Sequence, residues 1–293
     1  MQIHAPAKLN LCLYLGATRE DGLHELCSLF EPLALADRIT LPTLTTPEGG
    51  QCRMRNEPEG DEVVCPGVEG ENLAARALAV LRECGWAHPP LRIEIEKRIP
   101  VAAGLGGGSA DAAAVLRLAA GEVADLEEIA AGLGADVPSQ LTPAPALVRG
   151  AGEQVERLPE PAPHAVVLLP DGGGLSTAEV FAEADRLGLG RPAAELDELA
   201  GHLRAAAGAG ASPLGYAELL VNDLEPAAIS LRPRIGEALE LLRGVGASKA
   251  LLTGSGPTTF GLFANLAAAR EAAQRLGRDD AIACEAGTAE VRR

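Results

Sequence analysis

The clearest pattern in the chain is a strict alternation of apolar and charged side chains over residues 91–96, which read Leu-Arg-Ile-Glu-Ile-Glu. A period of two predicts a β-strand, and its regular charged face predicts a sheet with one face in water. A similar alternation predicts an earlier strand over residues 8–15. In that strand one face would carry Leu9, Leu11, Leu13 and Leu15. The opposite face would carry Asn10, Cys12 and Tyr14.

Helical periodicity and end signals predict several helices in the first half of the chain. Asn72 is placed to cap a helix that ends at Gly85, and an alanine-rich helix is expected over residues 110–119. Another helix begins at Asp125, with Glu128 in the capping-box position. Short strands are expected over residues 38–41 and 62–64, and the segment 43–72, rich in Pro, Gly and charge, reads as hairpin loops.

The chain changes character after residue 158, where three prolines fall within residues 159–163. We therefore expect two domains, residues 1–158 and 159–293. The second half predicts a helix-backed antiparallel sheet, with strands over 166–169, 250–252 and 259–263 and helices after Ser176, over 235–242 and over 266–276. The expected fold class is α+β.

Composition narrows the choice of partners. The 293 residues carry a formal net charge of −16 and only 2% aromatic side chains, which argues against nucleic-acid or membrane-surface binding and favours small-molecule substrates. No apolar run reaches the length of a membrane span and no leader is evident, so a cytoplasmic location is expected. The six cysteines form no CxxC pair, so we expect free thiols and no zinc site.

A glycine-rich segment, residues 100–113, lies between the clearest strand and a helix. Glycines let successive N–H groups converge on one anion, and the helix N-terminus adds further donors, so the segment predicts a phosphate site. The segment is not a Walker loop, because the residue directly before Ser109 is Gly108 and not lysine. A dinucleotide-binding fingerprint that starts at Gly104 would need Gly or Ala at position 109. A simple glycine-rich connector remains the alternative.

The Pro-x-x-x-Gly-Leu-Gly-Gly-Gly-Ser segment, residues 100–109, resembles the phosphate-binding motif of the GHMP kinase superfamily. Other segments follow in the order typical of one branch, whose acceptor is a cytidine diphosphate-linked methylerythritol of the non-mevalonate isoprenoid pathway. They are residues 5–11 (Ala-Pro-Ala-Lys-Leu-Asn-Leu), 21–24 (Asp-Gly-Leu-His), 133–138 (Leu-Gly-Ala-Asp-Val-Pro), 222–226 (Asn-Asp-Leu-Glu-Pro) and 252–258 (Leu-Thr-Gly-Ser-Gly-Pro-Thr).

The resemblance implies a two-domain GHMP kinase fold, with an N-terminal α+β nucleotide-binding domain and a C-terminal ferredoxin-like, helix-backed antiparallel sheet. It also implies ATP and Mg²⁺ as cofactors and phosphorylation of the 2-hydroxyl of that acceptor. Two alternatives stay open: another small-molecule GHMP kinase, acting on mevalonate, a sugar or homoserine, and a non-catalytic nucleotide-binding regulator. The oligomeric state is not indicated.

The same resemblance implies a catalytic pair, Lys8 and Asp136, on either side of the accepting hydroxyl. A carboxylate can take the proton of the alcohol, and a nearby ammonium keeps that carboxylate ionised. The alternatives are a helix-capping role for Asp136, which precedes Pro138, and an ordinary surface position for Lys8.

For the nucleotide, the resemblance implies contacts from the glycine segment and from Asn72, which could also act only as a helix cap. Ser109 would offer its hydroxyl to phosphate or Mg²⁺, or cap the following helix. The implied set is Asn72, Pro100, Gly104, Leu105, Gly106, Gly107, Gly108, Ser109 and Ala110. Three cations are expected to help attract the phosphates: Arg19, Lys97 and Arg98.

For the acceptor, the resemblance implies Asn10 near the methylerythritol hydroxyls, His24 on the cytosine edge, and Phe181 and Thr177 along the cytidine. The family usually has Tyr directly before the histidine, where this chain has Leu23. Because stacking on an aromatic ring contributes roughly 1–3 kcal/mol per base, this change is expected to weaken cytidine binding. Ala102 and Ala110 are smaller departures, in the places of a usual glycine and a usual serine.

Overall fold

Two sheets organise the part of the chain that the computed structural model describes, residues 1–41, 60–68 and 70–287. The first sheet has the order β3-β4-β2-β5-β6, with β1 paired to β2, and among its described strands only β3 and β4 are parallel neighbours. Its strands are β1 (Gln2–Thr18), β2 (His24–Thr40), β3 (Glu62–Val64), β4 (Arg92–Glu96), β5 (Ala146–Gly150) and β6 (Gln154–Arg157).

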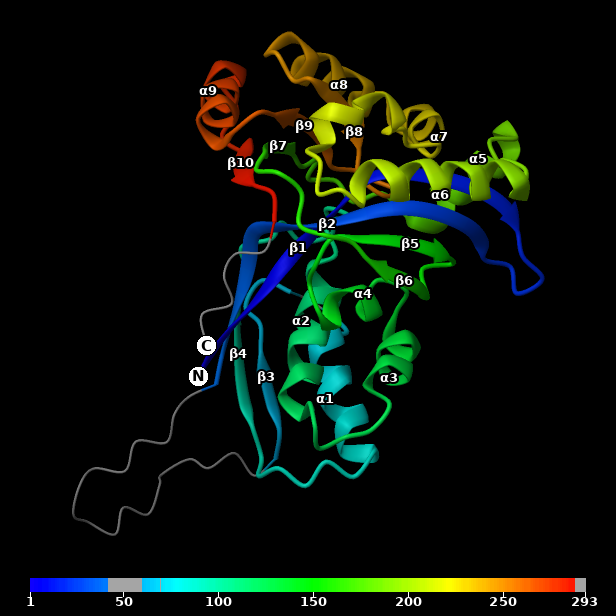
Figure 1. Ribbon diagram of the computed structural model, residues 1–293. Coiled ribbons are helices and arrows are strands. Elements are labelled where there is room, and N and C mark those ends of the chain that lie inside the picture. Colours follow the sequence, from blue (N-terminus) through cyan, green and yellow to red (C-terminus); the bar gives the residue numbers. More distant parts are fainter. Residues whose placement is uncertain (42–59, 69, 288–293) are drawn as a thin grey trace.

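The second sheet is antiparallel throughout, in the order β10-β7-β9-β8. Its strands are β7 (Ala165–Leu169), β8 (Lys249–Leu252), β9 (Thr259–Phe263) and β10 (Ile282–Glu285). One face is covered by helices, as the sequence predicts, while the other faces β1 and β2 (Figure 1). The helices of this half are α5 (Thr177–Leu187), α6 (Ala193–Ala207), α7 (Glu225–Leu231), α8 (Arg234–Gly244), α9 (Leu266–Leu276) and the 3₁₀ helix η2 (Pro213–Leu219).

A second group of helices packs against the first sheet in the N-terminal half. These are α1 (Leu73–Glu83), α2 (Gly107–Leu116), α3 (Leu126–Leu133), α4 (Val137–Leu141) and the 3₁₀ helix η1 (Arg117–Ala119). Helix α2 is buried on nearly all sides, because its alanines allow α1, α4 and the sheet to approach closely. This central helix begins at Gly107, inside the glycine segment. Among the described residues, no helix combines the length and apolar character needed to cross a membrane.

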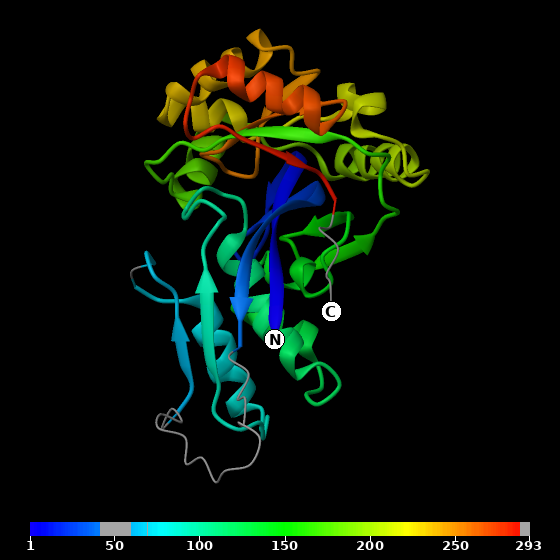
Figure 2. The ribbon, with the colours of Figure 1, turned by 90° about the vertical axis from the view of Figure 1, so that its left-hand side faces the viewer.

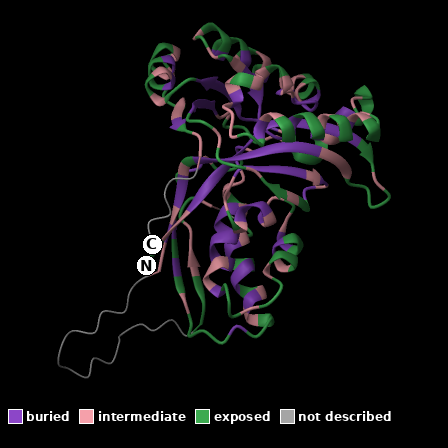
Figure 3. Ribbon diagram, viewed as in Figure 1, coloured by how far each residue is buried: buried purple, intermediate pink, exposed green. Residues whose placement is uncertain are grey.

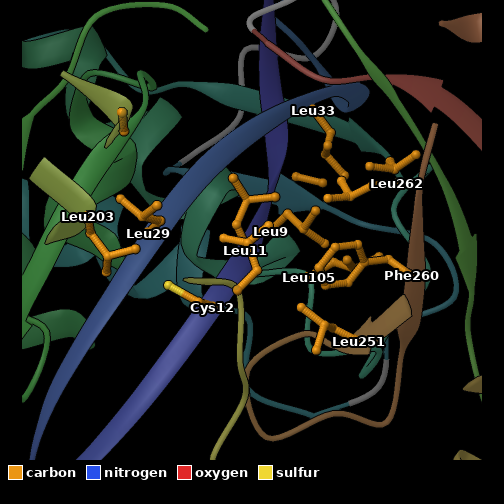
Figure 4. Close-up of a cluster of buried hydrophobic side chains, with 14 of the residues drawn as sticks. Leu9, Leu11, Cys12, Leu29, Leu33, Leu105, Leu203, Leu251, Phe260 and Leu262 are labelled. Atoms are coloured by element: carbon orange, nitrogen blue, oxygen red, sulfur yellow. The ribbon is translucent and has the colours of Figure 1, made fainter. Parts of the chain in front are cut away.

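The long strands β1 and β2 join the two halves of the molecule. They extend from the N-terminal helices to the second sheet (Figure 2) and are buried along most of their length (Figure 3). One apolar cluster connects them to the second sheet and includes Leu9, Leu33, Leu105, Phe260 and Leu262 (Figure 4). A residue on β1 can therefore contact both halves.

One expected feature of β1 is wrong. Leu9 and Leu11 lie in the same cluster as Cys12 and Tyr14, whereas Leu13 and Leu15 face the core beneath α5, α7, α8 and α9. The pairing register with β2 shifts between Asn10 and Cys12. A bulge of this kind adds one residue and exchanges the two faces of a strand, so the four leucines do not share a face.

Other expectations differ in their bounds or caps. The strand expected over residues 38–41 is the end of the continuous β2, and α2 begins three residues before the predicted helix. Helix α3 begins after Asp125 as predicted, but no side chain caps it, so the capping box is wrong. The strand at 62–64, the Asn72 cap, the alternating strand and α9 are confirmed.

Two further predictions concern the chain's organisation. Most of the expected hairpin loops of segment 43–72 fall on residues 42–59 and 69, outside the described residues. The chain leaves the first sheet at Arg157 and enters the second at Ala165. The domain bounds remain a prediction.

Candidate active site

Lys8 lies on β1 with its side chain almost fully enclosed. The residue is 6% exposed, so the alternative of an ordinary surface lysine is wrong. Its Nζ donates to Asn10 Oδ1 at 2.6 Å and lies 3.2 Å from Asp136 Oδ2. The ammonium also sits 4.4 Å from the centre of the Phe30 ring, a favourable cation–π position. Three partners therefore fix the position of this charge.

Asp136 approaches Lys8 from a distant part of the chain, directly before α4. It occupies the N-cap position of that helix, but its side chain makes no capping hydrogen bond. The capping alternative is therefore wrong, and the carboxylate pairs with Lys8 instead. The Asp136 side chain is 34% exposed and that of Lys8 is 7% exposed, so the acid is the more open member of the pair, although both residues line the same cavity.

Asn10 ties this pair to its surroundings. Its Oδ1 accepts from Lys8, its Nδ2 donates to Ser28 Oγ at 2.9 Å, and its backbone N–H donates to Thr253 Oγ1 at 2.9 Å. Thr253 begins the turn of residues 253–258 between β8 and β9, hereafter the β8–β9 turn. The first strand and the second sheet are thus joined at the candidate site.

The glycine segment lies against both Lys8 and the β8–β9 turn. Gly104 and Gly106 have positive φ angles of 75° and 68°. A Cβ added at Gly106 would lie 2.7 Å from Lys8 Cγ, and one at Gly104 would lie 2.4 Å from the Gly256 carbonyl oxygen. Only glycine satisfies both the backbone angles and these close approaches. The backbone of this segment is therefore held within reach of the Lys8–Asp136 pair.

Helix α2 presents unused donors beside that pair. Gly106 is its N-cap and supplies no side chain, and Ser109 is its third residue, so the alternative in which Ser109 caps this helix is wrong. Within the described part of the chain, the backbone N–H groups of Gly107, Gly108 and Ser109 have no hydrogen-bond acceptor. Free amides at the positive end of a helix dipole can bind an anion. Ala110, by contrast, is buried and already donates to the Gly106 carbonyl oxygen.

Two cavities meet at the glycine segment. The larger, of about 800 Å³, lies between the two halves of the molecule, and the smaller, of about 330 Å³, lies beside α1 and the end of β4. Gly104, Gly106 and Ser109 line both cavities. A molecule in one cavity can therefore reach a molecule in the other across the start of α2.

The smaller cavity collects most of the residues expected to contact nucleotide. It is lined by Asn72, Pro100 and every residue from Ala102 to Ser109, whereas Ala110 lines neither cavity. Asn72 Oδ1 accepts from the Ala74 and Ala75 N–H groups at 2.9 and 3.3 Å. It is therefore a helix cap and a cavity residue at the same time.

A buried ionic cluster supports both ends of the glycine segment. Lys97 Nζ contacts Asp37 and lies 2.7 Å from Asp111 Oδ2 on α2. Asp37 Oδ1 accepts from the Arg98 and Ile99 N–H groups at 2.6 and 2.8 Å. Burial raises the pKa of Asp111 to about 7, although the Lys97 ammonium opposes this shift. The cluster joins the end of β4 to the first turns of α2.

The cations expected to attract phosphate are all engaged with carboxylates. Lys97 is held by two of them, Arg98 contacts Glu96, and Arg19 contacts Glu153 at 2.8 Å. Lys97 nevertheless lines the smaller cavity, whereas Arg19 and Arg98 line neither cavity. The contribution of these three cations to phosphate attraction stays a prediction. Lys8 and the free backbone amides remain as donors beside the cavities.

The far end of the larger cavity brings together the residues expected to contact cytidine. His24 and Phe181 have ring centres 4.9 Å apart, tilted by 43°. His24 Nε2 lies 2.8 Å from Asp185 Oδ1 and 3.2 Å from Thr18 Oγ1. With Nε2 donating its proton to the Asp185 carboxylate, Nδ1 is left as an acceptor.

Two more cavity residues complete this end. Thr177 Oγ1 lies 2.9 Å from Ser255 Oγ in the β8–β9 turn, so helix α5 is fastened to that turn. Leu23 is 55% exposed and lines the cavity beside His24. An aliphatic side chain therefore stands where the family pattern has an aromatic ring.

Sequence reasoning missed several residues that shape the cleft: Phe30, Asp37, Asp185, Asn222 and Ser255. Asp185 could have been found, because it lies four residues after Phe181 and so shares its helix face. Asn222 and Ser255 stood in motifs without an assigned role. Phe30 and Asp37 gave no local signal, since each acts through a pairing set by the fold.

Comparison with known protein families and structures shows to which class of protein the chain belongs. Residues 72–142 match the N-terminal domain of GHMP kinases and residues 201–281 match their C-terminal domain. A homoserine kinase from Cytophaga hutchinsonii, 19% identical, shares the fold with a TM-score of 0.68 over 98% of this chain and 94% of that chain. The cleft lies between two halves of this type, so the protein is a small-molecule kinase that uses ATP.

Nearer relatives narrow the family. The chain is 42% identical to the 4-diphosphocytidyl-2-C-methyl-D-erythritol kinase of Thermobifida fusca, over 94% of this chain and 90% of that protein. It is 40% identical to the kinase of the same name from Pelotomaculum thermopropionicum, over 94% and 93%. A crystal structure of 4-(cytidine 5'-diphospho)-2C-methyl-D-erythritol kinase superimposes with a TM-score of 0.78 at 36% identity, covering 98% of this chain and all of that one. The chain belongs to the 4-diphosphocytidyl-2-C-methyl-D-erythritol kinase family.

Proposed function

We propose that this protein transfers the γ-phosphoryl group of ATP to the 2-hydroxyl of 4-diphosphocytidyl-2-C-methyl-D-erythritol, giving the 2-phosphate and ADP. The reaction belongs to the non-mevalonate route to isoprenoids. The observation that carries the proposal is the Lys8–Asp136 pair, 3.2 Å apart, beside the unpaired amides at the start of α2. The names of the family's members supply the acceptor.

The two cavities divide the substrates between them. The smaller cavity, with Asn72 and Pro100 in its wall, takes the nucleoside part of ATP. The triphosphate then follows the glycine segment toward Ser109, which lines both cavities, so that its γ-phosphoryl group faces the larger one. The free N–H groups of residues 107–109 bind the phosphate oxygens.

The residues present fit a Mg²⁺ ion held mainly by the nucleotide. Mg²⁺ is usually bound by one or two protein oxygens together with substrate phosphates and water. The Ser109 hydroxyl is in the right place, because it stands where the two cavities meet. When bound, the ion supplies positive charge to the transferring phosphoryl group. We assign Ser109 as its protein ligand.

Asp136 and Lys8 act on the accepting hydroxyl. The Asp136 carboxylate accepts the hydroxyl proton as the oxygen forms its bond to the γ-phosphorus, and the bond from that phosphorus to the β–γ bridging oxygen breaks to release ADP. Lys8 stabilises the ionised carboxylate and the negative charge on the phosphoryl oxygens. Asn10 fixes the Lys8 ammonium and faces the methylerythritol hydroxyls.

The far end of the larger cavity binds the cytidine. In the tautomer that donates from Nε2 to the Asp185 carboxylate, 2.8 Å away, Nδ1 of His24 accepts from the exocyclic amine of cytosine. Phe181 supplies one stacking surface and Thr177 lies along the ribose side. Leu23 covers the other face of the base with less stacking energy than an aromatic ring.

The remaining proposals concern the binding partners of the protein and its location in the cell. We propose that the partners are small molecules only, with no nucleic acid and no membrane surface, in keeping with the net charge of −16. We also propose that the protein acts in the cytoplasm.

ADP release measured with a coupled assay tests the proposal. The protein is supplied with ATP and Mg²⁺ and with one alcohol at a time: 4-diphosphocytidyl-2-C-methyl-D-erythritol, mevalonate or homoserine. We expect release that depends on the cytidine diphosphate acceptor. Release with only another alcohol would identify a different small-molecule kinase, and binding of ATP with no release for any alcohol would favour a regulator.

A further inference from the structure

Asn222 is a buried residue whose side chain binds the end of β8, the β8–β9 turn and its own segment. Its Nδ2 donates to the carbonyl oxygens of Leu252 and Gly254 at 2.7 and 2.8 Å, and its Oδ1 accepts from the Leu224 N–H at 2.9 Å. The residue is 3% exposed and lines neither of the two cavities. Both donors and the acceptor of the amide are therefore committed to the protein itself.

The β8–β9 turn contacts three parts of the cleft: the glycine segment, Asn10 on β1 and Thr177 on α5. Gly256 packs on Gly104 of the glycine segment, where a Cβ would lie 2.4 Å from the Gly256 carbonyl oxygen. Thr253 accepts from the Asn10 N–H at 2.9 Å, and Ser255 pairs with Thr177 at 2.9 Å. A displacement of this turn would therefore reach the phosphate-binding backbone and the Lys8 partner together.

The segment around Asn222 is itself fixed to β1. The Leu13 N–H donates to the Val221 carbonyl oxygen at 2.8 Å, and the Asp223 N–H donates to the Leu13 carbonyl oxygen at 2.9 Å. Asp223 Oδ2 also accepts from the Leu15 N–H at 3.0 Å. Asn222 thus stands between the strand that carries Lys8 and the turn that meets the glycine segment.

We propose that Asn222 is a positioning residue for phosphoryl transfer. Through the β8–β9 turn it fixes Asn10, in the middle of β1, and Gly104 of the glycine segment relative to each other, in addition to the direct hydrogen bond from the Lys8 N–H to the Leu105 carbonyl oxygen at 2.9 Å. The inference rests on the proposed kinase activity. Without the amide, two buried carbonyl oxygens lose their donors and the turn must shift to regain partners. A displacement of about 1 Å near reacting groups can reduce a rate about 100-fold.

The test compares Asn222→Ala and Asn222→Asp with Asn265→Ala in the same ADP-release assay. The aspartate keeps an acceptor for Leu224 but removes both donors. Asn265 caps α9 by accepting from the Ala268 N–H at 2.9 Å and lines neither cavity, so its variant is a control for the loss of a structural asparagine. Thermal unfolding shows which variants are folded at the assay temperature.

Both Asn222 variants are expected to fold and to lose about 10- to 100-fold in kcat, with a smaller change in the KM of the cytidine acceptor. The Asn265 variant is expected to keep its kcat within about twofold. Folded Asn222 variants with normal kcat would overturn the proposal, and so would unfolding of both, which would make Asn222 a stability residue. If the unmodified protein itself showed no acceptor-dependent turnover, the proposed function would fail instead.

Discussion

The two ends of the larger cavity are built differently. At the transfer end, Lys8 and Asn10 are 6% and 2% exposed and are held by side-chain and backbone partners from distant segments. At the cytidine end, Leu23 is 55% exposed, and His24 and Phe181 contact each other directly. The transfer end therefore depends on a fixed geometry, whereas the cytidine end can accept a substitution such as Leu23 and still form a cavity.

The largest effect is expected from removing the acid at the transfer end. Asp136→Asn leaves the side chain's shape but no longer accepts a proton, so kcat should fall about 10²- to 10⁴-fold while ATP binding, measured by calorimetry, is largely kept. Asp280→Asn is the control, since Asp280 pairs with Arg278 away from both cavities. A near-normal kcat for Asp136→Asn would remove its assigned role.

A smaller gain is expected at the cytidine end. Leu23→Tyr adds a stacking surface opposite Phe181, so the KM of the cytidine acceptor should fall about tenfold, within the roughly 1–3 kcal/mol of base stacking. The KM of ATP should not change. Leu187→Tyr adds the same ring on an exposed site that lines neither cavity. Equal acceptor KM values for both variants would show that the base does not lie beside residue 23.

The buried ionic cluster of Lys97, Asp37 and Asp111, which supports the start of α2 beside the transfer end, should make the stability of the protein depend on pH. Burial raises the pKa of Asp111 to about 7, so between its ordinary value and pH 7 the folded protein retains a proton that the unfolded chain has released. The free energy of unfolding therefore falls as pH rises through this window, by up to about 1.4 kcal/mol per pH unit from this group.

Urea unfolding at pH 5, 6 and 7 measures that slope. Asp111→Asn should flatten the decline relative to the unmodified protein, because the amide does not titrate. Asp280→Asn should leave the slope in this window unchanged, since Arg278 lowers the pKa of Asp280 below it. If the free energy of unfolding fell equally with pH in Asp111→Asn and in the unmodified protein, the raised pKa of Asp111 would not be the cause of the pH dependence.

The smallest effect concerns the backbone of the glycine segment. Ala102 is exposed and has a φ of 56°, in the left-handed region. Replacing it with glycine relieves steric strain but adds freedom to the unfolded chain, so Ala102→Gly should raise the free energy of unfolding by only about 0.5–1 kcal/mol. Ala103→Gly, at a buried position without positive φ, should lower it. Thermal and urea unfolding measure whether each variant is more or less stable than the unmodified protein.

Local patterns predicted the parts of the fold that depend on neighbouring residues. The alternating strand over 92–96, the Asn72 cap and α9 are confirmed because periodicity and caps act within a few residues. The bulge between Asn10 and Cys12 could not be predicted in this way, because it depends on pairing with β2. The same holds for the uncapped start of α3, where backbone geometry at Asp125 excludes the capping box.

In the candidate site too, local motifs predicted some residues, whereas contacts made by tertiary packing could not be predicted. The glycine segment and the resemblance placed Lys8, Asp136 and Ser109 beside one cavity, which the structure shows. The engagement of Lys97 by Asp37 and Asp111 was not predictable, because residues 37, 97 and 111 meet only through tertiary packing. Asn222 was visible in a motif, but its contacts with Leu252 and Gly254 depend on the position of the second sheet.

A crystal structure with a non-hydrolysable ATP analogue, Mg²⁺ and the cytidine diphosphate acceptor tests the central claim most directly. The account predicts that the γ-phosphate contacts the amides of residues 107–109. It also predicts that the 2-hydroxyl lies within hydrogen-bond distance of Asp136, with Lys8 beside both. An acceptor hydroxyl or a γ-phosphate bound away from Lys8 and Asp136 would contradict it.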